Sequence, residues 1–95
     1  MVTIKQRDNG IDGMFFAIND GQEIAEMSYF WDGDDTIVIA STKVADKYQN
    51  QGIGKKMVAE CVDFARKEDV RIYPQCAFAK QIFIQTPEYK DVLLR

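Results

Sequence analysis

The chain has 95 residues, of which 46% are hydrophobic and 12% aromatic, and its formal net charge is −3. This length and apolar content indicate one folded domain over residues 1–95 and argue against a disordered chain. The sequence has no histidine, and its two cysteines do not form a CxxC pair. A metal site and catalysis by a histidine base are therefore not expected.

The N-terminal sequence, MVTIKQRDNG, lacks the apolar segment of a leader peptide. The longest apolar run, MFFAI, is too short to span a bilayer. We therefore expect a cytoplasmic protein without membrane contact, in which both thiols are reduced. We also expect it to be a monomer or a weak dimer. The acidic balance and the lack of an arginine-rich aromatic surface argue against nucleic-acid binding.

Charge is distributed unevenly along the chain. Residues 1–40 contain two basic and eight acidic residues, so they carry a net charge of −6 and residues 41–95 carry +3. An anion-binding surface is therefore expected in the C-terminal half, whereas the N-terminal half could attract a cationic partner. The alternative for the acidic half is a solvated surface without a partner.

Four segments before residue 45 have the alternation or β-branched composition of strands, and turn sequences separate them. They are residues 2–7, 14–19, 22–31 and 36–44. From Ile53 the apolar residues recur with helical spacing. This stripe consists of Ile53, Met57, Val58, Cys61, Val62 and Ala65.

The rest of the chain predicts a short irregular strand, VRIYPQC, then a short helix, AFAKQIF. A last helical segment follows, with Thr86 as its N-cap and Pro87 at its first position. This order predicts an α+β fold with one mixed, mostly antiparallel five-stranded sheet, one long helix and one or two short C-terminal helices.

The junction between the fourth strand and the long helix carries two glycines, Gly52 and Gly54, and two lysines, Lys55 and Lys56. A helix N-terminus offers unpaired N–H groups, and glycines let an anion approach the backbone closely. The spacing differs from the P-loop and from the dinucleotide-binding fingerprint. The alternative is that the glycines only turn the chain and that the lysines are solvated.

Gln49, Gly52 and Gly54 form the pattern Gln-x-x-Gly-x-Gly at this strand-to-helix junction. The chain here resembles the GNAT superfamily of acyl-CoA-dependent N-acetyltransferases. The later segments IYPQCAFAKQIF and TPEYKDVL are similar to a short subgroup that lacks the N-terminal helices of the superfamily. The resemblance implies a minimal GNAT-like fold with acetyl-CoA as the acyl donor.

The resemblance also implies which residues bind the donor. Thr42 and Val44, at the end of strand four, would bind pantetheine and polarise the thioester carbonyl. Phe78 and Lys80, on the following short helix, would line the other side of the cofactor. The pyrophosphate would be held by the loop and the start of the long helix, namely Gln49, Asn50, Gln51, Gly52, Ile53, Gly54 and Lys55.

Cys76 is the candidate catalytic residue. It follows a strand interrupted by Pro74 and precedes a helix, whose N–H groups would lower the pKa of its thiol. The alternative is that Cys76 is a buried packing residue. Cys61 lies on the apolar stripe and is expected in the core.

Larger relatives use a tyrosine on the last helix as general acid, but Phe83 occupies this helix, and the nearest tyrosines are Tyr73 and Tyr89. The expected function is transfer of acetyl from acetyl-CoA to an unidentified amine, with a cationic peptide or protein as one class of acceptor. Direct attack by the amine and transient acylation of Cys76 both stay open. The alternative is a non-enzymatic CoA-binding or protein-interaction module.

Overall fold

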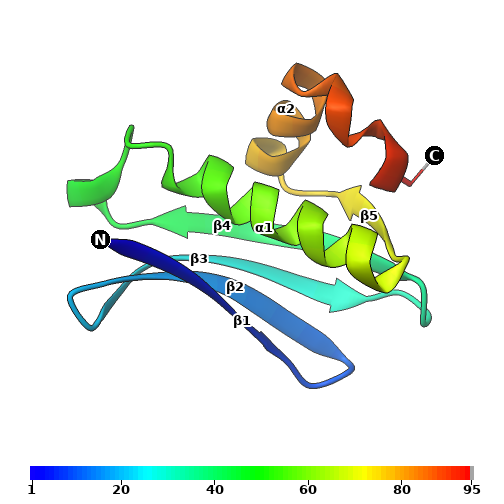
Figure 1. The fold of residues 1–95 in the computed structure, drawn as a ribbon, viewed down its shortest axis with the longest axis horizontal. Coiled ribbons are helices and arrows are strands. Elements are labelled where there is room, and N and C mark those ends of the chain that lie inside the picture. Colours follow the sequence, from blue (N-terminus) through cyan, green and yellow to red (C-terminus); the bar gives the residue numbers. More distant parts are fainter. Residues whose placement is uncertain (95) are drawn as a thin grey trace.

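The computed structural model describes residues 1–94 as one five-stranded sheet with helices packed against it (Figure 1). The elements are β1 (Val2–Asp8), β2 (Asp12–Asn19), β3 (Gln22–Trp31), β4 (Thr36–Val44), η1 (Asp46–Tyr48), α1 (Ile53–Glu68), β5 (Arg71–Pro74), α2 (Ala77–Gln85) and η2 (Pro87–Val92). The predicted α+β class and sheet type are confirmed. No helix in this part of the chain is long and apolar enough to cross a membrane.

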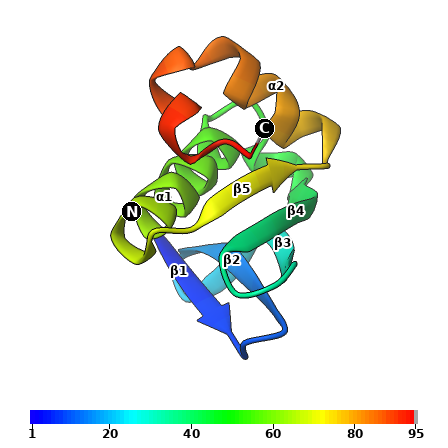
Figure 2. The same ribbon diagram turned by 90° about the vertical axis from the view of Figure 1, so that its right-hand side faces the viewer.

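The strands lie in the order in which they occur along the chain. β1 to β4 form an antiparallel meander, and β5 pairs with β4 in parallel because α1 carries the chain back across the sheet. α1 lies across one face of the sheet, and α2 and η2 stack beside it near β5 (Figures 1 and 2). Within residues 1–94, no helix covers the opposite face.

The core lies between this face of the sheet and α1. The apolar stripe of α1 is buried as predicted, with Met57, Val58, Cys61 and Val62 fully inaccessible to solvent. Sheet residues such as Ile37 and Ile39 pack against this stripe in the same core. Burial of this apolar stripe, more than helix propensity, therefore stabilises α1.

β4 contains an irregularity that matters for the site. Tyr29 pairs with Ile39, but the next pair joins Ser28 to Ser41, so Ala40 is an extra residue in β4. Side chains alternate between the two faces of a strand, and a bulge shifts this alternation by one residue. Thr42 therefore shares the helix-covered face with Ile39, although it is an odd number of positions, three, farther along the strand.

At the C-terminal end, Thr86 is the N-cap residue and Pro87 begins the last helical segment, as predicted. The Thr86 side chain forms no capping hydrogen bond, however, and the segment is a 3-10 helix. The fifth strand spans only Arg71–Pro74, because after Pro74 the N–H groups of Gln75 and Cys76 both donate to the carbonyl of Ile39. The chain therefore leaves the sheet two residues earlier than its composition suggests.

The open face of the sheet is protected at one place by an ion pair. The guanidinium of Arg7 lies 4.1 Å from the ring centroid of Phe16 and 3.3 Å from a carboxylate oxygen of Glu23. Arg7 thus covers an aromatic side chain that points away from the core, and Phe16 is buried.

At the end of the sheet near the β1–β2 turn, Tyr29 is buried and donates its hydroxyl proton to Asp8 across 2.5 Å. The side-chain amide of Gln6 donates to the same hydroxyl at 2.8 Å. Directly opposite Tyr29 in the antiparallel register stands Gly13. A Cβ atom at Gly13 would lie 2.6 Å from the backbone oxygen of Arg7 and closer still to the Tyr29 ring. Only glycine leaves room for this ring.

We predict that Gly13→Ala lowers the free energy of unfolding by about 1–3 kcal/mol, because the added methyl group displaces the Tyr29 ring. Urea unfolding followed by circular dichroism measures this change. Thr3→Ala, at an exposed position of β1, serves as the control and should change stability by less than about 0.5 kcal/mol. A Gly13→Ala variant as stable as the parent would show that the ring is not confined in solution.

Candidate active site

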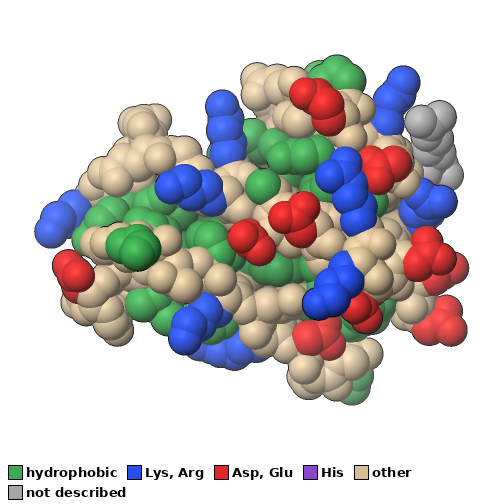
Figure 3. Space-filling view, viewed as in Figure 1, with side chains coloured by type: hydrophobic (Ala, Val, Ile, Leu, Met, Phe, Trp, Pro, Cys, Tyr) green, Lys and Arg blue, Asp and Glu red, His purple; other side chains and the backbone are tan. Residues whose placement is uncertain are grey.

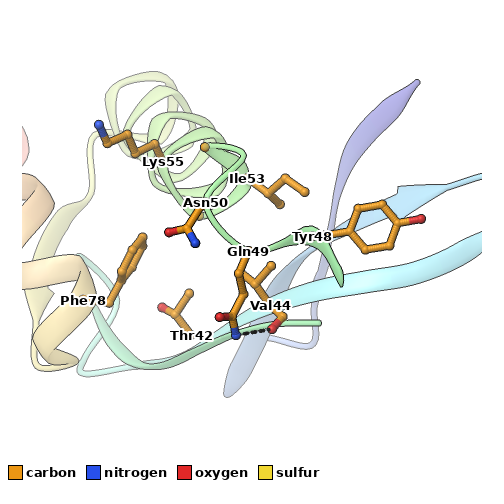
Figure 4. Close-up of a pocket in the computed structure, with 10 residues that line it drawn as sticks. Thr42, Val44, Tyr48, Gln49, Asn50, Ile53, Lys55 and Phe78 are labelled. Carbon is orange, nitrogen blue, oxygen red and sulfur yellow. Dashed lines mark hydrogen bonds between the residues drawn. The ribbon is translucent and has the colours of Figure 1, made fainter. Parts of the chain in front are cut away.

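The site lies where β4 and β5 separate. The parallel pairing ends at Ile39 and Pro74, and beyond this point no strand in residues 1–94 pairs with β4 on the side of β5. A cavity of about 550 Å³ opens here, between the end of β4, the start of α1 and the first turn of α2 (Figure 4). It is lined by Thr42, Val44, Tyr48, Gln49, Asn50, Gly52, Ile53, Gly54, Lys55 and Phe78.

The N-terminus of α1 faces this cavity with free hydrogen-bond donors. The first intrahelical bond runs from Lys56 N–H to the carbonyl of Gly52, so the N–H groups of Ile53, Gly54 and Lys55 have no partner within the helix. The first turn contains no acidic residue, and no side chain caps it. This arrangement favours an anion, because the helix end also carries a partial positive charge.

The loop before α1 has a tightly turned backbone. Asn50 and Gly52 both adopt the left-handed conformation, with φ of 65° and 78°. A side chain at Gly52 would meet no atom within 4 Å, so glycine is favoured there by backbone conformation and not by lack of space. The turn brings the N–H groups of α1 toward the cavity.

The side chain of Gln49 links the loop to the end of β4 by a hydrogen bond. Its amide group donates to the carbonyl of Val44 at 3.2 Å (Figure 4). The same amide donates to a carboxylate oxygen of Asp46 at 3.3 Å. The amide of Gln51 instead contacts the carbonyl of Lys47 at 3.4 Å, and Gln51 does not line the cavity. The side chain of Gln49 thus lines the cavity wall while its donor group holds the loop.

Gly54 differs from Gly52, and here the expectation that its missing side chain clears the path of an anion needs correction. Gly54 has ordinary helical backbone angles and is buried. The space that its Cβ would occupy is filled by the ring of Phe78, whose Cε2 atom would lie 2.7 Å away. Phe78 therefore stands against the start of α1 and forms one end wall of the cavity (Figure 4).

Thr42 connects the cavity with Cys76. Its hydroxyl oxygen lies 3.5 Å from the Cys76 sulfur, and Cys76 is the N-cap residue of α2, as its position before a helix predicted. Partial burial by itself would raise the pKa of Cys76. The Thr42 hydroxyl and the backbone N–H groups at the start of α2 favour the thiolate more strongly, so the pKa is lower than that of an ordinary cysteine.

Cys61 is the opposite case. It lies on the buried stripe of α1 with no exposed surface, and burial raises the pKa of its thiol to about 12. Its placement in the core is as predicted. Of the two free cysteines, only the half-buried Cys76 combines access to solvent with groups that stabilise a thiolate.

Among the described residues, no tyrosine forms a hydrogen bond with the sulfur of Cys76, whose side-chain partner is Thr42. Tyr73 is exposed on β5, and the ring of Tyr89 packs against Phe83 with centroids 5.7 Å apart. Tyr48 also lines the cavity, although it was not among the residues predicted for the site. Its hydroxyl accepts a hydrogen bond from Asn19 at 3.2 Å, and its ring lies at the end of the cavity farthest from Phe78 (Figure 4). An aromatic residue next to the glycine loop was the available signal.

The structure thus brings together most residues that the resemblance implied for the donor site. Two of them, Gln51 and Lys80, lie outside the cavity lining, and so does the candidate catalytic residue Cys76. Lys80 is exposed on α2, and its backbone N–H donates to the carbonyl of Cys76. Among the described residues, no group of three or more histidine, cysteine or acidic side chains could hold a metal ion. The arrangement suits an anionic ligand with a reactive end near Thr42.

Comparisons with known proteins agree with this geometry. The family model for GCN5-related N-acetyl-transferases matches residues 14–92. A GCN5-like N-acetyltransferase candidate from Staphylococcus aureus, solved by NMR, is 32% identical; the match covers 97% of this chain and 87% of that one, with a TM-score of 0.75. None of the curated proteins matches the chain.

Two more distant structures share the fold. A GNAT family acetyltransferase from Elizabethkingia anophelis with acetyl-CoA bound is 16% identical, with 90% of this chain and 74% of that chain covered and a TM-score of 0.69. The ribosomal-protein-alanine N-acetyltransferase from Brucella melitensis biovar Abortus 2308 is 11% identical, with 81% and 62% covered and a TM-score of 0.70. These two matches show the fold alone. The family model and the 32% identical structure confirm the predicted family: the chain belongs to the GCN5-related N-acetyltransferases.

Proposed function

We propose that this protein is an N-acetyltransferase that uses acetyl-CoA as donor and an amine as acceptor. The proposal rests on the cavity at the start of α1, in a chain that belongs to this family. There, free N–H groups and Lys55 lie next to the end of β4, whose edge on the side of β5 has no partner strand within residues 1–94. A negatively charged pyrophosphate and an uncharged pantetheine arm need these two kinds of surface.

The residues present fit such a donor. The N–H groups of Ile53, Gly54 and Lys55 would hold the pyrophosphate, and the Lys55 ammonium adds a countercharge. Thr42 and Val44 would position the pantetheine arm along β4, with Phe78 opposite. Acetyl-CoA supplies an activated acyl group, so the protein needs only to bind, orient and stabilise charge on the thioester oxygen.

Two routes are chemically open at the Thr42–Cys76 pair. In the first, a neutral amine attacks the thioester carbon, the carbon–sulfur bond breaks so that CoA leaves as thiolate, and the proton of the amine passes to that thiolate or to solvent. In the second, the Cys76 thiolate attacks that carbon and releases CoA as thiolate. The amine then attacks the acetyl-cysteine, the Cys76 thiolate leaves, and the proton of the amine passes to the CoA thiolate or to solvent. The hydroxyl of Thr42 favours the thiolate form of Cys76 and therefore supports the second route.

For the acceptor we propose a cationic peptide or protein. Acidic side chains gather over the β1–β2 and β3–β4 turns, at the end of the sheet away from the start of α1 (Figure 3). They would act on the approach of a cationic partner and not on its reacting nitrogen. Two free thiols suit a reducing compartment, so we propose a cytoplasmic protein that acts as a monomer or weak dimer.

The direct test is a product assay. Acetyl-CoA is incubated with the protein and a panel of diamines, polyamines and lysine-rich peptides, and acetylated products are detected by mass spectrometry. We expect one class to be acetylated with matching release of free CoA thiol. Cys76→Ala should reduce turnover strongly if the covalent route operates and leave it unchanged if the amine attacks directly. Binding of acetyl-CoA without any product would indicate a CoA-binding module.

A second prediction concerns binding of the donor. Acetyl-CoA at 100 times its Kd should stabilise the fold by about 2.7 kcal/mol, because it binds only the native state. Thermal unfolding with and without the ligand measures this shift. Lys55→Ala should shrink the shift, since it removes a charge at the cavity, whereas Lys67→Ala, at the other end of α1, should not. Equal shifts for both variants would remove Lys55 from the site.

A third prediction concerns the two thiols. Iodoacetamide should label Cys76 and leave Cys61 unmodified in the folded protein, as mass spectrometry of peptides will show. Because the pKa of Cys76 is lowered, its labelling rate should reach half-maximum at a lower pH than that of an unstructured cysteine peptide.

Thr42→Val should move this half-maximum to higher pH, because the thiolate loses its hydroxyl partner. Ser41→Ala, at an exposed hydroxyl on the neighbouring residue, is the matched control and should leave the profile in place. Labelling of both cysteines at equal rates would contradict the structure.

A further inference from the structure

The contact between Gly54 and Phe78 joins the first turns of the two helices. An ideal Cβ on Gly54 would lie 2.7 Å from Cε2 of Phe78, 3.4 Å from Cε1 and nearer still to Cζ. The edge of the ring therefore rests directly on the backbone of α1. Because Gly54 has helical backbone angles, this contact, and not chain conformation, is what requires glycine.

Phe78 stands two residues after Cys76, in the first turn of α2. On the side of the sheet this turn is fixed by two bonds: Cys76 N–H donates to the carbonyl of Ile39 at 3.0 Å, and its sulfur lies 3.5 Å from the Thr42 oxygen. On the side of α1 the same turn is fixed by the Phe78 ring on Gly54. The turn that carries Cys76 is thus held between β4 and α1.

Phe78 is only partly buried in this position. Phe78 remains 41% exposed, whereas Ala79, Ile82 and Phe83 on the same helix are in the core and hold α2 to the protein. Attachment of α2 therefore does not depend on Phe78. In the first turn only Ala79 is in the core, and Ile82 and Phe83 lie one turn farther along α2, so the placement of this turn relative to Thr42 depends on Phe78.

We infer that Phe78, seated on Gly54, is a positioning residue that holds Cys76 against Thr42 at the end of the cavity. The inference rests on the proposed role of Cys76 in acetyl transfer. In it, the missing side chain of Gly54 makes room for the ring of Phe78 and not for an anion. A side chain at residue 54 displaces the ring, tilts the first turn of α2 and weakens the Thr42–Cys76 contact.

The Gly54→Ala variant tests this inference, because the inference decides whether the substitution raises or lowers the midpoint of thermal unfolding. In a helix without a neighbour at this point, alanine in place of glycine raises the midpoint of thermal unfolding, because alanine has the higher helix propensity. The seated ring predicts a lower midpoint. It also predicts that the half-maximum of Cys76 alkylation by iodoacetamide moves to higher pH, toward that of an ordinary cysteine.

Phe78→Ala separates the ring from the glycine. It should move the alkylation profile in the same direction, and in this background Gly54→Ala should raise the thermal midpoint, because no ring is left to displace. This reversal of sign is a coupling between the two residues. Ile84→Ala is the matched control: Ile84 is an apolar residue of α2 that is 66% exposed and outside the cavity. Its alkylation profile should equal that of the parent.

A Gly54→Ala variant that is stabilised in the parent background, or one that leaves the alkylation profile unchanged, would overturn the inference. Alkylation needs neither acetyl-CoA nor an acceptor. If the parent protein transfers no acetyl group but shows the coupling, the positioning role stands and the proposed function fails. If transfer occurs without the coupling, the function stands and the positioning role fails.

Discussion

The bulge at Ala40 is the constraint on which the cavity depends. Along a regular strand, Thr42 would face away from Ile39, because the two residues are three positions apart and side chains alternate. The extra residue in β4 reverses this alternation, so Thr42 and Val44 point toward the helices while Lys43 points to the open face. Without the bulge, the end of β4 would present a lysine to the cavity and the Thr42 hydroxyl could not reach Cys76.

The bulge acts together with the separation of β4 and β5. The carbonyl of Ile39 accepts from two successive N–H groups, those of Gln75 and Cys76, and this ends the parallel ladder. The chain then starts α2 beside a strand edge that no other strand of residues 1–94 pairs. The starts of two helices, α1 and α2, therefore lie near one strand end (Figure 1), and both direct N–H groups there. The positive electrostatic potential at the site therefore comes from the backbone N–H groups of both helices as well as from Lys55.

Much of the fold follows from local pattern. Alternation and β-branched residues place β3 and β4 at the residues where the structure has them, and helical spacing places α1. Turn residues such as Asp20 and Gly21, both with positive φ, set the hairpin between β2 and β3. The ends of β5 and η2 were less predictable, because they depend on which carbonyl accepts a bond and not on composition.

The residues of the site were predictable from family resemblance and not from local pattern. The glycine pattern and its place between a strand and a helix led to the loop residues through family resemblance. The bulge and the contact of Phe78 with Gly54 could not be found this way. Each depends on which residues become neighbours in space, such as Gly54 and Phe78, which lie 24 positions apart. No local pattern in the sequence specifies such a contact.

The two glycines of the loop show why a motif needs a physical explanation for each position. Gly52 is needed for a left-handed backbone in open space, where any side chain fits but strains the chain. Gly54 is needed for space beside an aromatic ring, where the backbone itself tolerates any residue. The first requirement is local, so it does not depend on the rest of the protein. The second depends on residue 78, so a smaller side chain there would permit a larger one at residue 54.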